Sequence, residues 1–79
     1  MFLSMTRQFD IEVDLNGWLV PMHIEQKGKG VFKVVYEDTI LGYLQQHGLF
    51  KWSALTDLVT PSLLNQQTTE KIGKAIINH

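Results

Sequence analysis

The 79-residue sequence has no cysteine, almost no net charge and no long hydrophobic run, and each absence excludes a class of protein. Without cysteine the chain forms neither disulfides nor thiolate metal sites, which fits a reducing compartment. Seven basic residues against eight acidic ones argue against a protein that wraps nucleic acid, because phosphates demand a positive excess. No apolar run approaches the roughly 20 residues needed to cross a bilayer, so we expect no membrane span.

The length predicts one domain. Splitting 79 residues would leave neither half enough buried surface to offset the entropy of ordering it. We therefore expect a single small domain over residues 1–79, in which residues 1–5 are loosely ordered. The opening segment has no basic leader and no small-residue cleavage site, so we predict no signal peptide and a cytoplasmic protein.

A β-hairpin is the clearest local pattern. Apolar and acidic residues alternate from Phe9 to Leu15, the period of a half-buried strand. Asn16-Gly17 is the preferred pair for a type I′ turn, because both central residues need a positive φ. The missing N–H of Pro21 then points away from the first strand, so the second strand is an edge, bulged or imperfectly paired there. A two-residue turn places four apolar pairs on one face: Phe9 with Ile24, Ile11 with Met22, Val13 with Val20, and Leu15 with Trp18.

Three more strands and a helix complete the predicted order. Residues 26–30 form a flexible polar connection, and strands follow over residues 31–37, 39–45 and 49–54. A C-terminal helix has Thr60 as its predicted N-cap and Pro61 as its first residue. Gly73 costs this helix about 1 kcal/mol relative to alanine, and the weak helix former NQQTT leaves it either continuous or broken into two pieces. Its apolar stripe contains Leu64, Thr68, Ile72, Ala75 and Ile76.

The predicted fold is α+β, an antiparallel β-meander of four or five strands with one C-terminal α-helix packed on one face. We expect the helix to cover the hairpin face that carries Phe9, Ile11, Val13, Val20 and Ile24.

The later strands do not alternate cleanly, so apolar side chains fall on both of their faces while one helix covers only one. The outward-facing interface candidates are Val35, Leu41, Tyr43 and Trp52. An uncovered patch of several hundred Å² on such a face typically marks an interface. The leading hypothesis is a non-enzymatic interaction module that forms a homodimer or docks on a larger assembly, through the sheet face or edge that the helix leaves uncovered. The alternative is that the sheet curls until residues 54–67 cover this face.

The ionisable residues predict no catalytic residue, no metal site and no cofactor. His23 opposite Asp10 could orient an imidazole, but no serine or cysteine is predicted beside it. A cross-strand ion pair on the surface is the simpler interpretation. His47 and His79 are most simply solvated, and the three histidines share no metal-ligand spacing.

A rival hypothesis is a small ligand-binding protein or enzyme with a pocket between sheet and helix. Trp18, Met22 and Tyr36 would line this pocket, and His23 would give it polarity. A buried His23 beside a cavity favours this hypothesis, whereas a solvent-facing His23 paired only with Asp10 argues against it.

Two charged patterns remain. The three acidic residues of the first strand splay along it, so we interpret them as a solvated face that discourages edge-to-edge pairing rather than as a cation site. Lys33, Lys51 and Trp52 could form a basic-aromatic patch for single-stranded nucleic acid, but the acidic balance of the chain makes this the third hypothesis.

Overall fold

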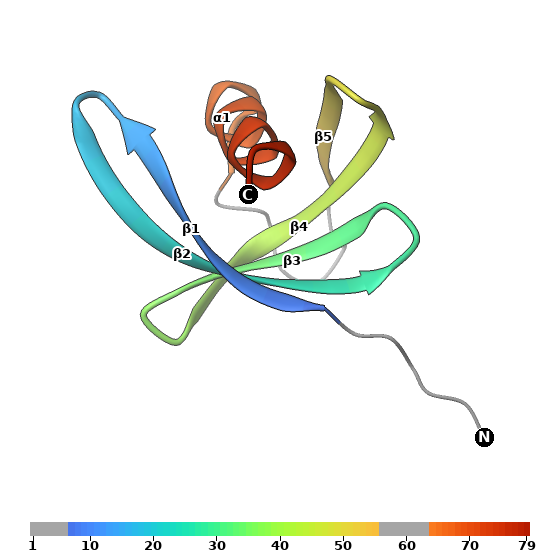
Figure 1. Ribbon diagram of the computed structural model, residues 1–79, viewed down its shortest axis with the longest axis horizontal. Coiled ribbons are helices and arrows are strands. Elements are labelled where there is room, and N and C mark those ends of the chain that lie inside the picture. Colours follow the sequence, from blue (N-terminus) through green and yellow to red (C-terminus); the bar gives the residue numbers. More distant parts are fainter. Residues whose placement is uncertain (1–6, 56–63) are drawn as a thin grey trace.

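The computed structural model describes residues 7–55 and 64–79, which form one five-stranded sheet and one helix (Figure 1). The sheet is an antiparallel meander in which each strand pairs with the next along the chain. The predicted α+β meander with a C-terminal helix is therefore confirmed. The elements are β1 (Gln8–Leu15), β2 (Trp18–Gly28), β3 (Val31–Tyr36), β4 (Thr39–Gly48), β5 (Lys51–Leu55) and α1 (Gln66–Ile77).

The β1–β2 hairpin has the register that its apolar pattern predicts, from Leu15 opposite Trp18 onward. Asn16 and Gly17 adopt φ values of 55° and 89°, as a type I′ turn requires. The carboxylate of Asp14 accepts a hydrogen bond of 2.9 Å from the Gly17 N–H, which ties the turn to the strand before it. A one-residue slip would expose the whole apolar set, so burial and turn chemistry select the same register.

Pro21 lies where β2 extends beyond its next neighbour. The pairing of β2 with β3 begins at His23 opposite Val35, two residues after the proline. Among the three possibilities raised by the sequence, Pro21 therefore occupies an edge segment, where its missing N–H removes no ladder hydrogen bond.

The later strands differ from the expectation in length, and their pairing contains register shifts. The predicted flexible connection over residues 26–30 is too long, because β2 continues to Gly28 and only a short turn precedes β3. Register shifts occur at Gln26/Gly28, at Val34/Val35 and at Gln46/Gly48. Each shift lets one extra residue enter a strand, which breaks the period of two and bends the sheet.

The helix begins later than predicted. Asn65 is its N-cap, and the Asn65 Oδ1 accepts a hydrogen bond of 2.7 Å from the Thr68 N–H. Thr60 and Pro61 lie outside the described residues. The helix is continuous from Gln66 to Ile77, so of the two alternatives that the sequence left open, the unbroken helix is the one formed over this segment.

The sheet curls around the helix instead of lying flat beneath it. Figure 1 shows α1 in the hollow of the sheet, with the β1–β2 hairpin on one side of the helix and β5 on the other. The helix contacts β1, β4 and β5. The helix covers the expected face of the hairpin. On this face Ile11, Val13 and Ile24 are buried, and Phe9 and Val20 pack against the core. The buried apolar residues are Ile11, Val13, Met22, Ile24, Phe32, Val34, Leu44, Trp52, Leu64 and Ile72.

Candidate functional site

The four predicted interface residues divide between the two faces of the sheet. Val35 and Tyr43 alternate with the buried Val34 and Leu44, so they lie on the outer face, away from the helix. Both are half-buried. Their cross-strand partners on this face are more exposed: Ile40, opposite Val35, is 48% exposed, and Leu55, opposite Tyr43, is 39% exposed.

The prediction that Leu41 and Trp52 point outward is wrong. Val34 pairs with Gly42 and Val35 with Ile40, so Leu41 is the extra residue of a bulge and packs against the core. Trp52 is 5% exposed and its ring centroid lies 5.5 Å from that of Phe32. An indole buried in this way cannot join Lys33 and Lys51 in a nucleic-acid patch.

The rival pocket does not form from its predicted residues. Trp18 is 76% exposed at the β1–β2 turn, whereas Met22 is 3% exposed within the core. His23 lies on the outer face, where its Nδ1 is 2.8 Å from Asp10 Oδ1 and its Nε2 is 3.7 Å from Glu25. Tyr36 is half-buried at the end of β3. These side chains do not converge, and His23 is partly exposed on the outer face, where it contacts Glu25 as well as Asp10.

The outer face carries a charged cluster around Glu25. Its carboxylate lies 2.9 Å from the Lys27 Nζ and 3.6 Å from the Lys33 Nζ. The hydrogen bond from Lys27 is the largest influence and lowers the pKa of Glu25 below 4.5; desolvation opposes it, and the charges of Lys27, Lys33 and His23 lower the pKa further.

A histidine–serine contact went unpredicted because it depends on a register shift near the β4–β5 turn. His47 Nε2 lies 2.6 Å from Ser53 Oγ, so the imidazole is hydrogen-bonded rather than simply solvated. Within residues 7–55 and 64–79, no third side chain hydrogen-bonds to the other ring nitrogen of His47. The same residues contain no group of three or more His, Asp or Glu side chains that could hold a metal ion.

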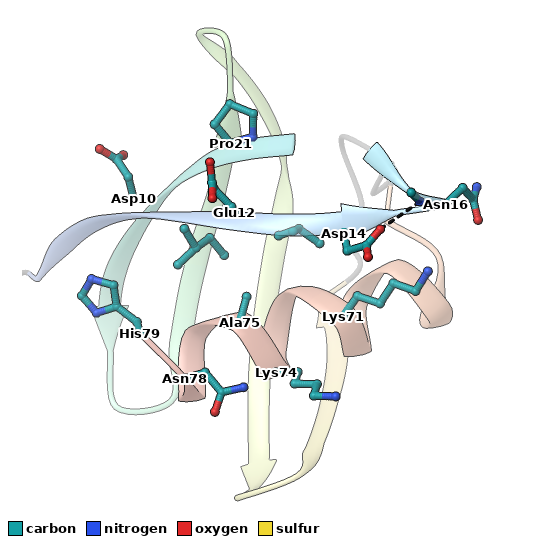
Figure 2. Close-up of a pocket in the computed structure, with 13 residues that line it drawn as sticks. Asp10, Glu12, Asp14, Asn16, Pro21, Lys71, Lys74, Ala75, Asn78 and His79 are labelled. Atoms are coloured by element: carbon teal, nitrogen blue, oxygen red, sulfur yellow. Dashed lines mark hydrogen bonds between the residues drawn. The ribbon is translucent and has the colours of Figure 1, made fainter. Parts of the chain in front are cut away.

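A groove of about 1000 Å³ runs between β1 and α1 (Figure 2). One wall consists of β1 and its turn, and the other consists of the exposed side of the helix. The strand wall includes Asp10, Glu12, Asp14, Asn16 and Gly17, and the helix wall includes Lys71, Lys74, Ala75, Asn78 and His79.

The free edge of β1 borders this groove. Arg7 O accepts from Gln26 N at 2.8 Å, and residues directly opposite each other alternate between bonded and non-bonded pairs. The backbone groups of Phe9, Ile11 and Val13 therefore face β2. The N–H and C=O groups of the residues between them, the three acidic ones, point away from the sheet, where no strand of the described residues pairs with them.

The two walls of the groove carry opposite charges. Figure 2 shows Asp10 and Glu12 projecting from β1 on the side away from α1, while Lys71 and Lys74 extend from the helix. Glu12 makes no hydrogen bond or ion pair with any described residue, and Pro21 stands directly opposite it on β2. The central carboxylate of β1 is thus unpaired among the described residues.

The other edge of the sheet offers much less. β5 has five residues against eight in β1. The start of α1 also approaches it, because Gln66 Nε2 donates a hydrogen bond of 3.0 Å to the Trp52 carbonyl. A short and partly covered edge is the usual protection against unwanted pairing.

Comparisons of the chain with protein-family models, with curated proteins and with solved structures gave no match. In the described part of the chain, no helix combines the length and the apolar character that a membrane crossing requires. The alternation of acidic and apolar residues in β1 was a sequence signal for this strand edge. It did not show that α1 forms the other wall of the groove.

Proposed function

We propose that the protein is a non-enzymatic interaction module that binds an extended segment of another protein along the free edge of β1. The observation that carries this proposal is the coincidence of an unpaired strand edge with a groove beside it. An added strand would continue the sheet, and the helix wall would contact its inward-facing side chains.

The backbone of β1 supplies the binding groups. Asp10, Glu12 and Asp14 each present one outward N–H and one outward C=O. Each hydrogen bond that a partner strand completes contributes about 0.5–1.5 kcal/mol net, so a short segment would bind weakly and reversibly. Side chains on alternate positions of the segment would then set its specificity.

Amide exchange measured by NMR tests this proposal. The probes are capped eight-residue peptides in which valine alternates with lysine, with threonine or with glutamate. We expect at least one peptide to slow exchange at Asp10, Glu12 and Asp14, while Ile11 and Val13, already paired with β2, change little. N-methylation of the peptide at the amides that face β1 should abolish the effect, and N-methylation at the amides that face away should preserve it. If no peptide protects these three amides, the proposal fails.

Self-association through the outer face is a second candidate function. It is favoured by the exposed Ile40 and Leu55 beside the half-buried Val35 and Tyr43. Light scattering at micromolar concentration tests it by measuring the molar mass. A protein that keeps the mass of one chain when concentrated would contradict it. For either function we propose a cytoplasmic protein, because a chain without cysteine needs no oxidising compartment.

A further inference from the structure

We infer that the segment bound at the β1 edge carries basic residues at alternate positions, with small apolar residues between them. This inference rests on the proposed function and identifies the chemistry of the partner. It follows from the direction in which the side chains at this edge point.

The acidic side chains belong to the same residues whose backbone groups point outward. In an antiparallel pair, directly opposite side chains have Cβ atoms about 4.5–5.5 Å apart on the same face of the sheet. Residues of a partner strand that bond to Asp10, Glu12 and Asp14 would therefore place their side chains beside three carboxylates. Lysine or arginine at these positions would pair with them, and acidic residues would be repelled.

The carboxylates retain capacity for such partners. Glu12 is unpaired within the described residues, as shown above. Asp10 has a side chain that is 80% exposed, and only its Oδ1 contacts His23. Asp14 uses its Oδ1 for the Gly17 N–H. Each of the three can thus accept a cation without losing its present contact.

The helix wall requires a different chemistry at the positions between. Side chains opposite Ile11 and Val13 would point inward, toward α1. There they meet Ala75 and the stems of Lys71 and Lys74, whose ammonium groups repel a second cation. A uniformly basic segment is disfavoured on this side, so the groove selects alternation rather than positive charge alone.

The same charges disfavour a second copy of this chain as the occupant. Edge-to-edge pairing of β1 with its own copy would place acidic residues beside acidic residues on the outer face. Like charges directly opposite on neighbouring strands are destabilising. Repulsion among the acidic side chains of β1 therefore disfavours self-pairing. The same side chains favour a partner strand with basic residues at alternate positions.

The affinities of four capped peptides test this inference by fluorescence anisotropy at moderate salt. Three are the alternating valine peptides with lysine, threonine or glutamate, and the fourth has the lysines and valines of the first peptide in two blocks. We expect the alternating lysine peptide to bind about tenfold more tightly than the threonine peptide, from three cross-strand ion pairs. The glutamate and block peptides should bind more weakly than the alternating lysine peptide.

A pair of variants assigns the effect to the groove. Glu12→Gln should weaken the lysine peptide about threefold and leave the threonine peptide unchanged. Asp38→Asn removes the same charge at an exposed turn two strands away and should change neither affinity.

The outcomes separate this inference from the proposed function. If all the alternating peptides protect the β1 amides and bind equally, the inference fails while the proposed function stands. If the block peptide binds as tightly as the alternating one, general electrostatic attraction explains the affinity and the inference fails. If no peptide protects the β1 amides, the proposed function itself fails.

Discussion

The contact between Gly73 and Trp52 makes the fold testable at a single position. Gly73 is buried in the middle of α1, and a Cβ built on it would lie 2.5 Å from three atoms of the Trp52 indole. Carbon atoms pack at about 3.5–4.0 Å, so the ring would have to retreat by about 1 Å. Because Trp52 is 5% exposed and packs against Phe32, it has little room to do so.

The size of the effect of Gly73→Ala follows from two opposing contributions. Alanine improves helix propensity by about 1 kcal/mol, which alone would stabilise the protein. Overpacking of a buried site costs about 1–3 kcal/mol, and a rigid ring at this distance belongs at the upper end. We expect the free energy of unfolding to fall by about 2 kcal/mol, which lowers the Tm by about 8–16 °C in a domain of this size.

Chemical denaturation followed by tryptophan fluorescence measures this change. The chain has two tryptophans, and Trp18 is 76% exposed, so a Trp18→Phe background leaves the buried Trp52 as the reporter. Gly28→Ala is the matched control, because a Cβ there meets no atom within 4 Å, and it should change the stability little. A Gly73→Ala variant as stable as the parent, or more stable, would refute the close approach of helix and indole. In a background that retains Trp18, with unfolding followed by circular dichroism because Trp52 is lost, Trp52→Phe should reduce the cost of Gly73→Ala, since a smaller ring can move away.

Three further predictions concern stability. Thr69 is fully buried and its Oγ1 has no hydrogen-bond partner in the described residues, so Thr69→Val should raise the free energy of unfolding by about 1 kcal/mol in urea denaturation, and a decrease would contradict this. Because the pKa of Glu25 is lowered in the fold, its stabilising effect is present above pH 4.5 and is lost as the pH falls through the lowered value; Glu25→Gln should therefore lower the Tm at pH 7, with the difference from the parent closing below pH 4.5 in thermal scans. Glu37 and Asp38 adopt φ values of 48° and 65°, so replacing them by Asn-Gly should stabilise the protein by about 1 kcal/mol, and an unchanged Tm would argue against a type I′ turn there.

The hairpin shows how far local pattern reaches into the structure. Phe9 to Leu15 alternate strictly and Asn16-Gly17 admits essentially one turn, so periodicity and turn chemistry agree on one register without information from the rest of the chain. The helix was predicted less well. Thr60-Pro61 matches a helix start in sequence, but the cap in the structure is Asn65, because several residue types suit an N-cap equally and packing selects among them.

The candidate site depended on features that local pattern does not contain. Leu41 and Trp52 were candidates for the outer face because the sequence left the register of the later strands open, whereas bulges in β4 decide the side to which its residues point and alter its pairing with its neighbours. The acidic row of β1 was visible in the sequence, but the lysines of α1 that face the same groove lie about 60 residues farther along the chain.

The sequence by itself determined the order of the elements and the hairpin register, since each depends on residues a few positions apart. Tertiary structure decided the edge position of Pro21, the curl of the sheet, the side occupied by Trp52 and the placement of an acidic strand edge along the same groove as the lysines of the helix. These features depend on how a twisted sheet closes around one helix, because the closed arrangement must bury all the core residues at the same time.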